Sequence, residues 1–175
     1  MEKKIVITGA PGTGKTAIID CLKKLGYSCS KEISREIIAE QLASGGDILP
    51  WKNLQAFSER VAALRKVQFD NAPNNKIHFF DRGIVDVIAY MRIDNLEIDN
   101  YLIKKCKEMK YSKSVFYTPI WEEIYIKDKE RKEDIFQAKL IEKELITAYK
   151  EFDYNLIEIP KSNIKERVKF ILSKR

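Results

Sequence analysis

The chain has 175 residues, of which 45% are hydrophobic and 33% are charged, and its net charge at pH 7 is +6. This length predicts one domain over residues 1–175, and the apolar content excludes a disordered or collagen-like protein. No run of residues is apolar enough to cross a membrane, and the short apolar run at the N-terminus leads into a glycine-rich loop. We therefore expect neither a membrane span nor a signal peptide.

The excess of positive charge lies in one half of the chain. Residues 101–175 contain 18 basic and 13 acidic side chains, whereas residues 1–100 contain 14 and 13. A basic half favours an anionic partner such as a nucleotide, RNA or an acidic lipid surface, but scattered lysines are equally typical of a solvated surface. The three cysteines are widely spaced and form no paired motif, which is typical of free thiols in a reducing cytosol. We therefore expect a cytoplasmic protein.

Short apolar runs alternate with longer segments of helical periodicity along the chain. The predicted strands and helices, in chain order, are strand 4–8, helix 16–25, strand 27–30, helices 34–43 and 54–71, strand 76–80, helices 84–91 and 100–107, strand 114–117, helix 134–150, strand 154–159 and helix 164–172. Such alternation predicts a mainly parallel sheet in a three-layer α/β/α sandwich. Ligands of open α/β sheets bind beyond the carboxyl ends of the strands, so residues that directly follow strands are the candidate site residues.

A phosphate-binding pattern, G-x-x-x-x-G-K-[ST], follows the first predicted strand and is matched in full by Gly9-Ala10-Pro11-Gly12-Thr13-Gly14-Lys15-Thr16. Its glycines allow the backbone N–H groups to converge on phosphate oxygens, and the helix that follows adds its positive N-terminal dipole. Lys15 supplies a charge to the β- and γ-phosphates, and the Thr16 hydroxyl is a candidate Mg²⁺ ligand. The pattern predicts a nucleotide site for ATP, with GTP possible.

Acidic and basic side chains follow two more of the predicted strands. Asp81 ends the third strand and is a candidate Mg²⁺ ligand, although an N-cap of the next helix is its alternative role. Arg82 beside it is a candidate phosphate clamp. Glu32 follows the second strand and is a candidate base for an acceptor hydroxyl, with Arg35 as an acceptor-binding residue; a first-turn Glu and a surface Arg are the alternative.

Two further segments contain candidate residues. Asp47 and Trp51 lie in the sequence GGDILPW and are candidate substrate-binding residues, because an aromatic ring can stack on a base, although core packing is as consistent with Trp51. A dense charge run between the fourth strand and the helix after it contains Arg131. Charge runs are usually solvated, but phosphotransferases close a basic lid over the γ-phosphate, so we predict a lid at about residues 120–134 with Arg131 as its arginine.

The sequence resembles small P-loop proteins of the AAA-type predicted ATPases. The resemblance lies in five motifs: the phosphate-binding loop at residues 9–16 (the P-loop), the Glu32-x-x-Arg35 element, GGDILPW, FFDRG and DKERKED. This group is similar to the nicotinamide-riboside kinase domain and, more distantly, to deoxynucleoside and thymidylate kinases. The resemblance implies the P-loop NTPase fold with strand order 2-3-1-4-5 and an ATP·Mg²⁺ site. It also implies an acceptor carboxylate at Glu32, an acid–arginine pair at Asp81 and Arg82, and a lid arginine at Arg131. The arginine finger and helical lid domain of the large AAA+ ring machines have no counterpart in the sequence.

Three functions are consistent with these features. The first is a P-loop kinase that transfers phosphate from ATP·Mg²⁺ to a hydroxyl of a nucleoside-like or vitamin-precursor acceptor. The second is a nucleotide-dependent switch that binds an anionic lipid surface or a protein partner through the basic half. The third and least favoured is a polynucleotide 5′-kinase, because no basic and aromatic stacking platform is evident; we therefore do not expect nucleic acid as a partner. The sequence does not indicate an oligomeric state.

Overall fold

One parallel sheet lies at the centre of the computed structural model, which describes residues 3–124 and 135–175. Its strands are β1 (Lys4–Thr8), β2 (Ser28–Cys29), β3 (His78–Asp81), β4 (Ser114–Tyr117) and β5 (Asn155–Glu158). They lie in the order β2-β3-β1-β4-β5, with every pairing parallel. The predicted α/β fold and strand order are therefore confirmed, and β1 is the central strand that leads into the glycine-rich loop.

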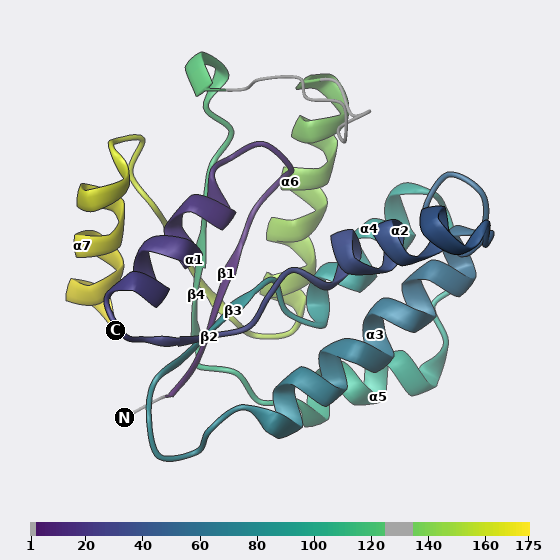
Figure 1. Cartoon of the computed structure of the whole chain (residues 1–175), viewed down its shortest axis with the longest axis horizontal. Helices are drawn as coiled ribbons and strands as arrows, with labels where there is room; N and C mark the ends of the chain where they lie inside the picture. The colour runs from purple at the N-terminus through teal and green to yellow at the C-terminus, as the bar shows by residue number, and fades with distance from the viewer. Residues whose placement is uncertain (1–2, 125–134) are drawn as a thin grey trace.

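Helices cover both faces of the sheet (Figure 1). They are α1 (Lys15–Lys24), α2 (Ile33–Ser44), α3 (Leu54–Asn71), α4 (Val85–Ile93), α5 (Asn100–Glu108), α6 (Ile135–Glu151) and α7 (Ile164–Lys174), with a short 3₁₀ turn at Glu122–Ile124. Residues along β1 alternate between the two faces, because successive side chains of a strand point to opposite sides. Ile5 and Ile7 pack with α1 and α7, whereas Val6 packs in the larger core under α3, α4 and α6. None of the helices within the described ranges is long and apolar enough to cross a membrane.

The only histidine of the chain, His78 in β3, is buried between two serines of the β2 segment. Its Nδ1 lies 2.9 Å from the Ser28 hydroxyl and its Nε2 lies 2.7 Å from the Ser30 hydroxyl. Burial, together with the charges of Lys4 and Lys76, lowers the pKa of His78 to about 4. The neutral ring therefore ties the edge strand β2, which has only two residues, to β3.

We expect the free energy of unfolding to decrease as the pH falls from 6.5 towards 4. The unfolded chain takes up a proton on His78 near pH 6.5, whereas the folded protein takes it up only near pH 4, so the stability present above pH 6.5 is lost in this window. The loss amounts to at most about 3 kcal/mol. Denaturant unfolding of wild type and His78→Gln between pH 4.5 and 7.5 measures this loss. The difference between the two pH profiles isolates the contribution of His78, because the carboxylates titrate in both proteins. Parallel pH profiles for the two proteins would contradict the expectation.

Candidate functional site

The glycine-rich loop, residues 9–16, connects β1 to α1 at the carboxyl end of the sheet. Gly12 and Gly14 have φ angles of 82° and 84°, in the left-handed region that favours glycine. A Cβ atom on Gly9 would collide with the hydroxyl and carbonyl oxygens of Thr118, which directly follows β4. The glycines of the pattern are therefore required by backbone conformation and by the close approach of the loop to β4.

The loop presents unused backbone donors, as a phosphate site requires. Within the described part of the chain, the N–H groups of residues 12–16 make no backbone hydrogen bond. Lys15 is buried, and its Nζ donates to the carbonyl of Ala10 at 2.7 Å. Burial, followed by repulsion from Arg82, lowers the pKa of Lys15 to about 7. These residues fit a nucleotide phosphate, whose negative charge would pair with Lys15 and accept from the free N–H groups.

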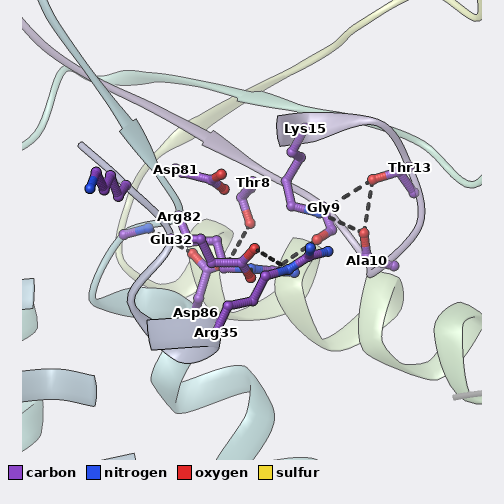
Figure 2. A network of polar contacts seen from close by, with 12 residues as sticks. Thr8, Gly9, Ala10, Thr13, Lys15, Glu32, Arg35, Asp81, Arg82 and Asp86 are labelled. Atoms are coloured by element: carbon purple, nitrogen blue, oxygen red, sulfur yellow. Dashed lines mark hydrogen bonds and ion pairs between the residues drawn. The ribbon is translucent and has the colours of Figure 1, made fainter. Parts of the chain in front are cut away.

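Arg82 lies at the centre of a buried polar network next to this loop (Figure 2). Its guanidinium donates to the carbonyl of Gly9 at 2.9 Å and to the carboxylate of Asp86 at 3.1 Å, and it lies 3.4 Å from Glu32. Burial lowers the pKa of Arg82, but the surrounding tyrosine and acids raise it well above the ordinary value, so the side chain stays charged. Its φ angle of 70° is unusual for a residue with a side chain, which indicates that the surrounding contacts hold this backbone in place.

Asp86 in α4 anchors this network, and it is a residue that the sequence analysis does not identify. One carboxylate oxygen accepts from the Thr8 hydroxyl at 2.7 Å, in addition to Arg82. The other accepts from the Gly83 N–H at 3.0 Å and from the Tyr149 hydroxyl at 2.6 Å. Burial raises the pKa of Asp86, but the charge of Arg82 and these hydrogen bonds outweigh burial and hold the pKa below its usual range. No pattern in the sequence indicates Asp86. It lies four residues after Arg82, but Arg82 precedes α4 and has a left-handed backbone, so the two side chains are not a pair within one helix.

Arg65 in α3 is a second buried residue that the sequence analysis misses. Its guanidinium donates to the carbonyl oxygens of Asp81 and Arg82, at 2.7 and 2.9 Å. The side chain is 2% exposed, so α3 contributes a buried cation directly beneath the end of β3. A helical arginine usually lies on a solvated face, and no pattern in the sequence distinguishes this one.

Glu32 immediately precedes α2 and lies between two arginines. One carboxylate oxygen is 3.4 Å from Arg82 Nε, and the other is 3.2 Å from Arg35 Nε. Burial raises the pKa of Glu32, but the charges of Arg82, Lys15 and Arg35 outweigh it, so the pKa is lowered and the group is a carboxylate at neutral pH. The structure therefore brings the predicted acceptor carboxylate, Arg35 and Arg82 together.

Asp81 ends β3 opposite Ile7 of β1, beside the beginning of the loop. It is buried, and its Oδ1 has no hydrogen-bond partner among the described residues. Burial, followed by the nearby charge of Glu32, raises its pKa, and Lys15 opposes this shift. A buried carboxylate oxygen without a partner is available to a Mg²⁺ ion, and the second candidate ligand, Thr16, is exposed. The alternative role of Asp81 is not observed, because α4 begins at Val85 with Ile84 at its N-cap position.

A cavity of about 800 Å³ joins the loop to this network. Residues 11, 12 and 14–17 form its phosphate end, and Glu32, Arg35, Arg65, Arg82 and Asp86 line its middle. Its far end, at α2, α3, α4 and the segment between α2 and α3, is mainly apolar and is lined by Ile38, Pro50, Trp51, Leu54, Phe57, Ser58, Val61, Val87, Tyr90, Ile93 and Asp94. Helix α6 contributes Gln137, Leu140 and Ile141 to the lining. The structure thus brings Trp51 to the cavity, with 46% of the residue exposed, whereas Asp47 is exposed and does not line the cavity. Arg131 lies outside the described residues.

Solved structures with a similar fold include several kinases. The chain matches deoxyadenosine kinase from M. mycoides with its products bound (21% identity, TM-score 0.68, 98% of this chain and 97% of that one). It also matches the NadR protein in complex with NR (17% identity, TM-score 0.66, 98% and 50%) and thymidylate kinase from Candida albicans (14% identity, TM-score 0.61, 99% and 91%). These matches establish the P-loop kinase-like fold, and at such low identities they establish the fold alone.

Sequence comparisons place the chain in a family. A search of curated proteins finds no match. The family model described as an AAA domain matches residues 4–167, which include the glycine-rich loop, Glu32, Asp81, Arg82 and the start of α7. The chain therefore belongs to the AAA domain family.

Proposed function

We propose that the protein is a kinase that transfers the γ-phosphoryl group of ATP, bound with Mg²⁺ at residues 9–16, to a hydroxyl group of a small acceptor. The observation that supports this best is the position of Glu32: its carboxylate is paired with Arg82, which also contacts the P-loop carbonyl of Gly9. An acceptor hydroxyl near Glu32 would therefore lie close to the phosphate end of the same cavity.

The charges of the site suit phosphoryl transfer. Glu32 accepts a hydrogen bond from the acceptor hydroxyl and orients it, and it takes up the proton as the new P–O bond forms while the terminal P–O bond of ATP breaks. Lys15 and Arg82 provide positive charge next to the negative charge that spreads over the transferred group. Bound Mg²⁺, for which Thr16 and Asp81 are the candidate ligands, would neutralise phosphate charge further. The lowered pKa of Glu32 favours orientation of the hydroxyl over early proton removal.

The acceptor class is proposed from the far end of the cavity. Its wall is mainly apolar and aromatic, which suits a flat ring, and Trp51 lies at this end. Deoxyadenosine kinase, thymidylate kinase and the NadR protein in complex with NR share the fold, which supports a nucleoside-like or vitamin-precursor acceptor. GTP in place of ATP, a cytoplasmic location, a single domain over residues 1–175, and a lid at about 120–134 with Arg131 stay predictions of the sequence.

Purified protein with ATP, Mg²⁺ and a panel of acceptors tests the proposal. The panel contains ribonucleosides, deoxynucleosides, nicotinamide riboside and other vitamin precursors with a free hydroxyl. We expect one class to raise ADP release well above the rate without acceptor, and mass spectrometry to show the phosphorylated acceptor. ADP release that no acceptor increases would contradict a kinase. The alternatives, a lipid- or protein-binding switch and a polynucleotide 5′-kinase, are not favoured by any specific contact among the described residues.

Replacing Glu32 with glutamine is expected to reduce turnover of the accepted substrate by about 10²- to 10⁴-fold, because the acceptor hydroxyl loses its proton acceptor. The affinity for a non-hydrolysable ATP analogue should change much less, since Glu32 does not belong to the P-loop. Steady-state kinetics and calorimetric titration measure the two effects. Arg60→Gln is a suitable control, because Arg60 is paired with Glu40 on the surface between α3 and α2. An E32Q variant with wild-type turnover would remove Glu32 from the mechanism.

A further inference from the structure

The tip of the P-loop is held from the last helix of the fold. Arg167 in α7 donates from NH2 to the carbonyl oxygen of Thr13 at 2.9 Å, across 154 positions of sequence. The residue is 2% exposed and makes no ion pair within the described residues. Next to it, Val168 and Ile171 pack α7 into the core that also contains the inner side of α1 (Figure 1). The guanidinium thus lies behind the loop, on the same side as α1, the helix that follows the loop.

Two other P-loop carbonyls are held in the same way. Arg82 holds Gly9, and Lys15 holds Ala10, as described above. These two cations also line the cavity, so a bound phosphate competes for them. Arg167 does not line the cavity, so its contact with the loop does not have to break when a nucleotide binds.

The contact determines the direction of one backbone donor. The C=O and N–H groups of a trans peptide point in opposite directions. Because the Thr13 carbonyl points to Arg167, the Gly14 N–H of the same peptide points away from it. That N–H has no backbone hydrogen bond within the described residues, and Gly14 lines the cavity. A flip of this peptide would present the Thr13 carbonyl, a negative dipole, to the phosphates.

We infer that Arg167 is a positioning residue of the nucleotide site. It holds the Thr13 carbonyl outside the cavity and so keeps the Gly14 N–H available for phosphate. The inference rests on the proposed binding of ATP at residues 9–16. A purely structural role, in which Arg167 only fastens α7 to α1, predicts lower stability without any specific effect on nucleotide affinity.

Calorimetric titration of the full chain with a non-hydrolysable ATP analogue and Mg²⁺ separates the two roles. We expect Arg167→Met to weaken binding by about tenfold, as the loss of one charged hydrogen bond would. Arg167→Lys should restore part of the affinity, because an ammonium group can also donate to the Thr13 carbonyl. Val168→Ala is the matched control: it removes buried volume from the same helix and lowers the melting temperature, and binding should stay within twofold of wild type.

The amide resonance of Gly14 in ligand-free protein gives a second, nucleotide-independent measurement. We expect it to shift in R167M more than in V168A, because only the former releases the Thr13–Gly14 peptide. Binding of the analogue to R167M within twofold of wild type, or equal losses in R167M and V168A, would overturn the inference. If wild type fails to bind the analogue, the proposed nucleotide function fails, and the Gly14 resonance alone then decides whether Arg167 fixes the loop.

Discussion

Lys15→Met is expected to bind a non-hydrolysable ATP analogue about 100-fold more weakly than wild type, or worse, and to lose turnover in proportion. Lys15 is the side chain whose position in the pattern and in the structure places a positive charge at the phosphate end of the cavity. The variant should fold, because methionine has a similar volume. Removing the charge should not destabilise the fold, because burial disfavours the charged lysine and the nearby acids offset this only in part. Calorimetric titration with Mg²⁺ and circular dichroism measure affinity and fold, and an unchanged affinity would contradict the P-loop assignment.

The same residue predicts how affinity depends on pH. In the free protein the pKa of Lys15 is lowered to about 7, chiefly by burial. Bound phosphates favour the charged form and raise this pKa, so binding takes up a proton when the pH lies between the free and the bound values. Affinity should therefore fall by up to about tenfold per pH unit above pH 7, and level off below it. The K15M variant should lack this dependence, and a flat wild-type profile between pH 7 and 9 would rule out a proton-linked Lys15.

Of the substitutions proposed for this protein, Asp86→Ala is expected to lower the free energy of unfolding most, by about 3–5 kcal/mol. The substitution leaves the Arg82 guanidinium buried without its acidic partner and removes the acceptor for Thr8, Gly83 and Tyr149. Turnover should fall as well, because Arg82 loses one of the contacts that hold it beside Glu32. Urea unfolding at pH 7 measures the stability.

The control for this variant is Tyr149→Phe. It removes one hydrogen bond to the same carboxylate and retains the ion pair, so a loss of about 1.5–3 kcal/mol is expected. Asp86→Asn adds a third comparison, because it keeps the shape of the side chain and removes only the charge. If Y149F destabilises the protein as much as D86A, the ion pair between Arg82 and Asp86 contributes little, and the importance of the network lies in Tyr149 instead.

The parts of the site that follow from local sequence were predictable. The glycine-rich loop needs glycines at fixed spacing, and Glu32 and Asp81-Arg82 follow strands whose carboxyl ends meet at one edge of the sheet. The alternation of strands and helices predicted the layers, and the resemblance supplied the strand order that spacing alone does not determine. Strand 27–30 was predicted too long, because only Ser28–Cys29 pairs with β3.

The parts that depend on tertiary packing were not predictable. Asp86, Arg65 and Arg167 lie on helices, where charged residues are normally solvated, and only the packing of those helices against the sheet buries them. Arg65 and Arg167 bind backbone carbonyls, and Asp86 binds Thr8 and Tyr149, which are far away in sequence, so these contacts leave no periodic signal. Asp47 was predicted to bind substrate because it lies close to Trp51 in the sequence. In the structure it follows α2 on the surface, is exposed and does not line the cavity.

The short edge strand β2 makes the two ends of the cavity unequal in local stability. The phosphate end is built on β1, which is paired on both sides, whereas Glu32 follows a strand with only two paired residues. Segments with few backbone pairs open more readily than the global fold does, so we expect residues 28–32 to open locally at a lower free-energy cost than β1. In the proposed kinase, the more rigid end would hold the phosphates of the constant cosubstrate, and the other end would adjust to the shape of the acceptor.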